Sequence, residues 1–275
     1  MIPIIAINCN MKKYYNENNI IFKIKDMCLT HFSRRCFIEE LNLLISKVNI
    51  SPNFNEQAYY NNIKRSIKYS RHKDFILAPS TFRFLDYYVL NTFQKELFAL
   101  SVCESIKAIL RLRGKSIRNS CISIFDAKEE NIFNIISCIS KEAKYIILVS
   151  EDLTKLARLN DYIIANYGIT PIITSNIKTS FNKADFIVTT KDIDITKNIP
   201  VWYINNSKIY RNKGICNINN VTYKVPWETD LEFNPELLGA ILCQMDKNNV
   251  EEAIKYNGIV LDKIRFNEDL VKIIR

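Results

Sequence analysis

The residues with the clearest chemical potential lie in one predicted turn, directly after the short apolar segment Cys121–Phe125. The turn reads Asp126, Ala127, Lys128, Glu129, Glu130, Asn131. A glycine-rich turn at this place lets the backbone approach a diphosphate, which then lies at a helix N-terminus. This turn has no glycine, and it has three carboxylates. Two like charges about 4 Å apart repel by about 4 kcal/mol near a protein surface. We therefore expect the turn to disfavour a diphosphate, with Lys128 offsetting only part of the repulsion.

The same acidic side chains have a structural interpretation, which we favour. Asp126 is predicted to be the N-cap of the next helix, and Glu129, three residues later, completes a capping box. Acidic side chains in a first helical turn also complement the helix dipole. On this interpretation the helix supplies its own anions.

Other polar side chains follow the predicted strands Tyr145–Val149 and Phe186–Thr190. Ligands of open α/β sheets bind beyond the carboxyl ends of the strands. An acid such as Glu151 can bind a ribose there, although Asp152 is the better helix cap. The candidate cofactor-contacting residues are Asp126, Lys128, Ser150, Glu151, Thr189 and Thr190.

The cysteines and histidines indicate little metal or nucleophile chemistry. The eight cysteines are scattered without a C-x-x-C pair, which favours reduced core thiols. Cys28, His31 and Cys36 supply three ligands, but a structural zinc site needs four, so no metal is expected. Only His31 and His72 are available for triad chemistry.

Composition indicates a globular chain of two domains, with 275 residues, 48% hydrophobic and 24% charged. The net charge of +9 raises the alternative of nucleic-acid association. We favour a solvated basic surface, in a chain as rich in Lys, Asn and Ile as an AT-rich coding sequence would give. The two basic clusters are Lys64, Arg65, Lys68, Arg71, His72 and Lys73, and Arg111, Arg113, Lys115 and Arg118.

Localisation and assembly follow only as expectations. No basic-then-apolar leader is visible, and no apolar run approaches the roughly 18 residues of a membrane span. We expect a cytoplasmic protein without a membrane partner, and a homodimer stays open.

In the first part of the chain, apolar spacing predicts a mixture of strands and helices. Pro79 is expected to stop the third strand. The predicted strands are Ile2–Ile7, Ile20–Met27 and Phe75–Ala78, and the predicted helices are Phe37–Val48, Glu56–Tyr69 and Phe82–Val89.

After a long helix, Lys95–Leu112, short apolar strands alternate with helices. This alternation predicts a parallel sheet covered on both faces. The strands are Cys121–Phe125, Tyr145–Val149, Ile169–Thr174, Phe186–Thr190 and Val201–Ile204, and the helices are Asn131–Ser140, Thr154–Asn166 and Ile177–Phe181. Further along come strands Val221–Val225 and Ile259–Phe266, helices Pro235–Met245 and Val250–Tyr256, and a short terminal helix.

A family resemblance rests on four of these segments. They read C-E-S-I-K-A-I-L-R-L-R-G from Cys103, C-I-S-I-F-D from Cys121, Y-I-I-L-V-S-E-D from Tyr145 and A-D-F-I-V-T-T from Ala184. Their pattern resembles the NAD(P)-binding domain of the shikimate dehydrogenase and amino-acid dehydrogenase type. The resemblance implies an α/β protein in which a smaller α/β domain precedes a Rossmann-like parallel-sheet domain. The expected boundaries are 1–94 for the first domain, 95–118 for a connector helix, 119–225 for the Rossmann-like domain, and 226–275 for segments returning to the first domain.

The catalytic Lys and Asp of that family have no counterpart that we can locate. Cys9, in I-N-C-N-M-K-K-Y-Y, is similar to the nucleophile motif of glutamyl-tRNA reductase. A buried cysteine at a strand end is the interpretation we favour.

These observations give three functional hypotheses. The first is a non-catalytic, pseudo-dehydrogenase protein with a binding, regulatory or assembly role and no cofactor. The second is an oxidoreductase of the shikimate dehydrogenase type that holds NAD or NADP through a remodelled loop. The third is a basic protein associated with nucleic acid.

Overall fold

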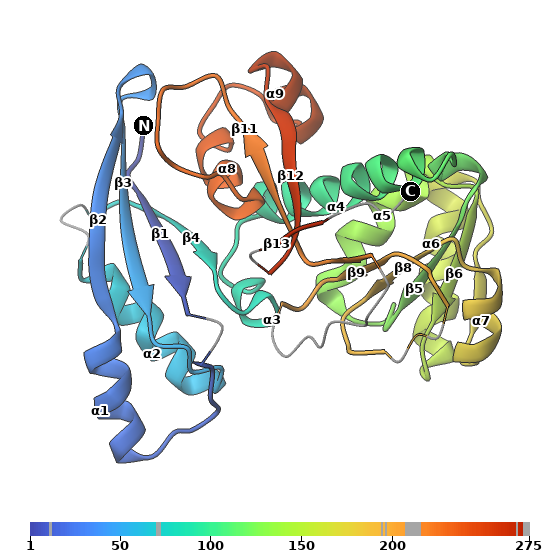
Figure 1. The fold of residues 1–275 in the computed structure, drawn as a ribbon, viewed down its shortest axis with the longest axis horizontal. Coiled ribbons are helices and arrows are strands. Elements are labelled where there is room, and N and C mark those ends of the chain that lie inside the picture. Colours follow the sequence, from blue (N-terminus) through green and yellow to red (C-terminus); the bar gives the residue numbers. More distant parts are fainter. Residues whose placement is uncertain are drawn as a thin grey trace. The chain divides into compact units, whose positions relative to one another are not determined.

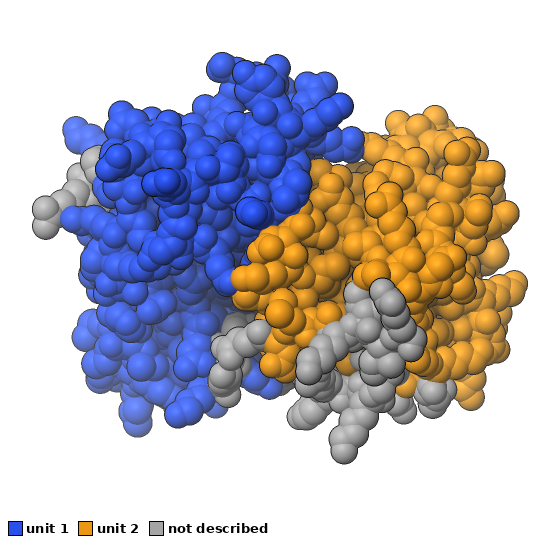
Figure 2. Space-filling view, turned by 45° about the horizontal axis from the view of Figure 1, so that its top comes forward, with its two compact units in different colours: residues 1–97, 222–260 blue, residues 98–221, 261–275 orange. Residues whose placement is uncertain are grey.

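A computed structural model describes residues 1–10, 13–69, 73–193, 195, 197–206, 216–267 and 269–271. The chain forms two compact units (Figure 2). Unit 1 comprises Met1–Leu97 and Thr222–Val260, and unit 2 comprises Phe98–Val221 and Leu261–Arg275. The chain passes between the units within helix α4 (Thr92–Leu112) and strands β11 (Asn220–Lys224) and β12 (Val260–Phe266). Residues 95–97 of the predicted connector segment 95–118 lie in unit 1, and the rest of the segment lies in unit 2.

Unit 2 contains a six-stranded parallel sheet of order β10-β9-β8-β5-β6-β7 (Figure 1). Counted along the chain from β5, this order is 3-2-1-4-5-6, which is the strand order of the Rossmann fold. The predicted α/β, Rossmann-like class is therefore confirmed by topology. The strands are β5 (Cys121–Phe125), β6 (Tyr145–Val149), β7 (Ile172–Thr174), β8 (Phe186–Thr189), β9 (Val201–Tyr203) and β10 (Asn217–Ile218).

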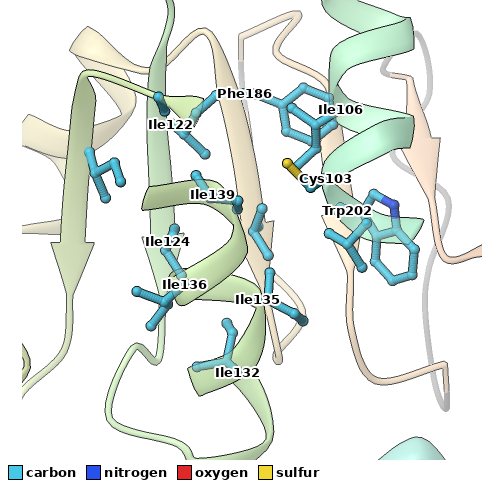
Figure 3. Packing of buried hydrophobic residues seen from close by; sticks show 14 of the residues in the cluster. Cys103, Ile106, Ile122, Ile124, Ile132, Ile135, Ile136, Ile139, Phe186 and Trp202 are labelled. Atoms are coloured by element: carbon cyan, nitrogen blue, oxygen red, sulfur yellow. The ribbon is translucent and has the colours of Figure 1, made fainter. Parts of the chain in front are cut away.

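The central strands of this sheet are buried on both faces, as the continuous apolar strands predicted, whereas Ile172 and Ile173 of the edge strand β7 are exposed. Ile122 and Ile124 of β5 pack with α4 and α5, whereas Phe125 lies in the cluster of the other face. Figure 3 shows side chains of α4, α5 and three strands meeting in the first cluster. The helices of unit 2 after α4 are α5 (Phe133–Glu142), α6 (Leu153–Tyr167) and α7 (Ile177–Lys183). Gly168 ends α6 with a left-handed backbone.

Unit 1 is built on a four-stranded mixed sheet of order β2-β3-β1-β4. Strand β1 is parallel to β3 and β4, and β2 is antiparallel to β3. The strands are β1 (Ile4–Cys9), β2 (His31–Ile38), β3 (Leu43–Ile50) and β4 (Ile76–Ser80), and the helices are α1 (Ile20–Leu29), α2 (Glu56–Ile67), α3 (Arg83–Asp86), α8 (Pro235–Leu242) and α9 (Val250–Tyr256).

Three predictions in unit 1 were wrong. The expected strand Ile20–Met27 is helix α1, which begins where the Asn19 side chain accepts a hydrogen bond from the Phe22 N–H at 3.0 Å. The expected helix Phe37–Val48 is the end of β2, a short turn and most of β3, and Asn42 closes the turn in a left-handed conformation that asparagine tolerates. Pro79 does not stop β4, because β4 is an edge strand and tolerates a residue without an N–H.

The C-terminal segment adds a small sheet of order β11-β12-β13. Strand β13 (Asp269–Leu270) pairs antiparallel with the end of β12, where the sequence predicted the start of a short helix. Three short 3-10 turns complete the described elements, at Glu39–Leu41, Ile117–Asn119 and Glu130–Ile132. None of the described helices combines the length and apolar composition needed to cross a bilayer.

Candidate functional site

The central switch point of the Rossmann sheet lies between β5 and β8, the two strands from which the chain order runs in opposite directions. Asp126 follows β5 directly and has a backbone φ of +53°. Glycine adopts this left-handed conformation freely, and aspartate is one of the few other residues that tolerates it. The turn therefore keeps a backbone conformation typical of glycine while carrying a carboxylate.

The Asp126 side chain bridges the switch point. Its Oδ2 accepts a hydrogen bond of 2.9 Å from the Thr190 hydroxyl, and its Oδ1 accepts one of 2.8 Å from the Lys191 ammonium. The Asp126 side chain is 16% exposed and that of Lys191 68% exposed. One strand-end acid is thus paired with a cation from the neighbouring strand end, at the place where a diphosphate would need free backbone N–H groups.

The predicted capping box was wrong. An N-cap residue has an extended backbone, whereas Asp126 is left-handed. The Glu129 N–H donates to the Asp126 carbonyl at 2.9 Å, and a 3-10 turn follows before α5 begins without a side-chain cap. The carboxylate is consequently available to β8 and not to its own helix.

Acidic groups surround the Lys191 ammonium. The hydrogen bond from Lys191 to Asp126 raises the pKa of Lys191, and the negative charges of Asp126, Glu129 and Glu151 raise it further, against a smaller lowering by desolvation. Lys191 is therefore held as a cation by carboxylates from two turns. Sequence analysis missed Lys191, although it directly follows the two threonines that were selected.

The other candidate cofactor-contacting residues lie at the same edge of the sheet, but most of their polar groups already make hydrogen bonds within the protein. The Thr189 hydroxyl donates to the Lys191 carbonyl at 2.8 Å, and the Thr190 carbonyl accepts from the Asn205 amide at 2.9 Å. Ser150 is buried, and its hydroxyl accepts from the Asp152 N–H at 3.2 Å.

Two of the candidate side chains, those of Lys128 and Glu151, are less engaged in contacts within the protein. Lys128 is half-buried, and within the described ranges its side chain makes no hydrogen bond or ion pair. Glu151 is exposed, and its charge acts on Lys191. Asp152 caps α6 by accepting from the Lys155 N–H at 3.0 Å, as predicted.

A second polar cluster follows the parallel strands of unit 1. Asp86 is fully buried and accepts hydrogen bonds from the Tyr59 hydroxyl, the Thr81 hydroxyl and the Thr81 N–H at 2.6 to 2.8 Å. Arg83 and Glu236 form a buried ion pair at 3.2 Å. Burial raises the pKa of Asp86 to about 6, and the charge of Glu236 adds to this effect while the hydrogen bonds from Thr81 and Tyr59 lower it.

Cys9, at the end of β1, does not have the properties of a nucleophile. Burial raises the pKa of its thiol strongly, and the charge of Asp86 raises it further. A reactive cysteine needs a lowered pKa. The favoured structural interpretation of Cys9 therefore agrees with its surroundings.

In the described part of the chain, neither the metal-ligand candidates nor the two basic clusters form a recognisable binding site. Among the described residues, no three His, Cys, Asp or Glu side chains are grouped to hold a metal ion, and the His31 ring contacts the Leu29 carbonyl at 2.9 Å. In the second basic cluster, Arg113 binds Asn198 and Lys115 pairs with Asp185. Arg71 and His72 of the first cluster lie outside the described residues.

Comparison with known proteins gives distant structural neighbours. No protein-family model and no curated protein matches the chain. Solved structures that match include shikimate 5-dehydrogenase from Listeria monocytogenes in complex with shikimate and NAD, with 7% identity, TM-score 0.40, and 94% of this chain and 92% of that chain covered. The ligand-free 5-ketofructose reductase of Gluconobacter sp. strain CHM43 matches with 9% identity, TM-score 0.41, and 95% and 94% coverage. L-tryptophan dehydrogenase from Nostoc punctiforme matches with 14% identity and TM-score 0.31 over 68% of this chain, which spans 56% of that chain. We transfer no residue role from these matches, and the fold assignment rests on the strand order.

Proposed function

We propose that this chain is a Rossmann-like protein that works by binding and not by hydride transfer, with a regulatory or assembly role. The observation that carries the proposal is the Asp126 carboxylate, held on Thr190 and Lys191 at the switch point. A dinucleotide diphosphate would have to displace these contacts. The residues present therefore do not fit an NAD or NADP molecule bound in the usual way.

Charge supports the same conclusion. Asp126, Glu129 and Glu151 all act on one ammonium, so the local charge is negative even with Lys191 bound. A diphosphate would add two more negative charges to this edge. Each like-charge contact near 4 Å costs between about 1 kcal/mol in water and about 4 kcal/mol near a protein surface.

The oxidoreductase alternative needs polar groups that can turn towards a cofactor. Thr189 and Thr190 are the cofactor contacts that this alternative uses. The Thr189 hydroxyl already donates to the Lys191 carbonyl, and the Thr190 hydroxyl already donates to the Asp126 carboxylate. It therefore predicts that a cofactor displaces the ion pair between Asp126 and Lys191. The nucleic-acid alternative predicts retardation in gels with a steep dependence on salt concentration.

Isothermal titration of the full chain with NAD⁺, NADH, NADP⁺ and NADPH tests the proposal. We expect no binding at micromolar concentration, and low-micromolar binding of any of the four overturns it. Asp126→Gly is the matched variant, because glycine keeps the left-handed backbone while the carboxylate is lost. If the carboxylate is a barrier, this variant should bind dinucleotides at least about tenfold more tightly than the wild type does.

A further inference from the structure

Helix α1 of unit 1 is amphipathic, but its acidic residue Asp26 is buried and its isoleucines are exposed. Its buried residue is Asp26, 2% exposed, whose carboxylate accepts hydrogen bonds from Tyr15, Ser51 and Asn53. Its isoleucines face solvent instead, with Ile20 76% and Ile21 75% exposed. A surface helix normally turns its apolar stripe to the core.

Five of the exposed apolar side chains of α1 form one continuous stripe, and the exposed Leu29 lies outside it. At 100° per residue, they occupy an arc of about 120° around the helix axis. The stripe consists of Ile20, Ile21, Ile24, Met27 and Cys28, all exposed. We call these residues the α1 stripe; α1 itself is labelled in Figure 1.

Lysines border the stripe on both sides. Lys23 and Lys25 follow it around the helix and are exposed, and the Lys25 ammonium lies 3.9 Å from the centre of the Tyr15 ring. The only acid of α1, Asp26, is buried. Helix α2, which contacts α1, exposes Lys64 and, in its first turn, Glu56, and Lys68 directly after it is exposed. The exposed charged side chains of α1 itself are both lysines.

We propose that α1 docks unit 1 onto an anionic lipid surface, with the α1 stripe entering the headgroup region and the bordering lysines contacting lipid phosphates. An apolar helix face bordered by lysines is typical of helices that lie in a membrane interface. Lysine side chains extend from such a face towards phosphate level.

Charge and size disfavour protein partners. A second copy of this chain would place Lys23 and Lys25 against the same lysines, with no exposed acid on either α1 to pair with them. A stable protein interface uses about 20–30 residues on each side. The five residues of the α1 stripe fall far short of that number, whereas a lipid surface needs no matching groove.

Flotation of the full chain with lipid vesicles tests the proposal. We expect binding to mixed phosphatidylcholine and phosphatidylserine vesicles, weaker binding to pure phosphatidylcholine, and a decline with added salt. The double variant I20Q/I24Q should lower vesicle affinity roughly tenfold or more, because two exposed isoleucines lose their apolar area. Lys23→Glu should lower affinity for the anionic vesicles alone.

Ile164→Gln is the matched control, since Ile164 is an exposed helical isoleucine of unit 2. It should leave affinity unchanged. Equal loss in the control, or no vesicle binding at low salt, overturns the proposal. A wild-type dimer in light scattering that I20Q/I24Q dissociates, without vesicle binding, overturns it in favour of a second copy.

Discussion

Asp126 and Asp86 both follow parallel strands, one in each unit, but their charges are balanced in different ways. Asp126 is partly exposed and pairs with the ammonium of Lys191. Asp86 is fully buried and is held by uncharged donors, beside the buried pair of Arg83 and Glu236. The difference teaches that the edge of unit 1 is held by buried contacts, whereas the edge of unit 2 carries an ion pair whose lysine is largely exposed.

The two tryptophans allow this comparison to be measured. Trp202 lies in unit 2, where its indole N–H donates to Ser105 at 2.8 Å. Trp227 lies in unit 1, with its ring 5.9 Å from that of Phe233. A Trp202→Phe background therefore reports on unit 1 by fluorescence, and a Trp227→Phe background reports on unit 2.

The largest effect is expected for Arg83→Leu in unit 1. The substitution leaves the Glu236 carboxylate buried without its cation and near Asp86, which should cost about 3–5 kcal/mol of unfolding free energy. Urea unfolding followed by Trp227 fluorescence measures the loss. The double variant R83L/E236L should recover most of it, because the Glu236 carboxylate is then no longer buried without its cation. A loss below about 1 kcal/mol for the single variant would break the comparison.

An intermediate effect is expected from pH, through Asp86. Its folded pKa is about 6, above its value near 4 in the unfolded chain, so folding favours the protonated form. The stability that it contributes is full below about pH 4 and is lost as the pH rises through about 6. Unit 1 should therefore be about 1 kcal/mol more stable at pH 5 than at pH 7 from this group.

Asp86→Asn isolates this contribution, since an amide does not titrate. The difference between wild-type and variant unfolding free energies, followed by Trp227 fluorescence, should change between pH 5 and pH 7. A difference that stays constant over this range would show that Asp86 does not bind a proton there.

The Rossmann-like unit was predictable because its signals are local. Cys121–Phe125 and Tyr145–Val149 are short apolar runs that became β5 and β6 without change. Unit 1 was harder, since Ile20, Ile21 and Ile24 favour a strand by composition. The helix depends on the Asn19 cap and on the burial of Asp26 by distant residues.

The sequence predicted which strand ends come together, but it did not predict the contacts between their side chains or the part of Lys191. Asp126, Thr189, Thr190 and Glu151 come to one edge because the carboxyl ends of parallel strands do. The left-handed backbone of Asp126 and its bond to Lys191 depend on the tertiary path of β8, which no local pattern contains. The capping box failed for that reason.

The smallest effect is expected for Lys191→Ala in unit 2. The ion pair with Asp126 is largely exposed on the lysine side, and exposed pairs contribute about 0–1 kcal/mol. Asp126 keeps its hydrogen bond from Thr190, so no buried group is left unpaired. Urea unfolding followed by Trp202 fluorescence should shift by less than about 1 kcal/mol, and salt should reduce even that shift. A loss above about 2 kcal/mol would mean that Lys191 is as structural as Arg83. A small loss would show that this pair contributes little to the folding of unit 2, in contrast to the buried pair of Arg83 and Glu236 in unit 1.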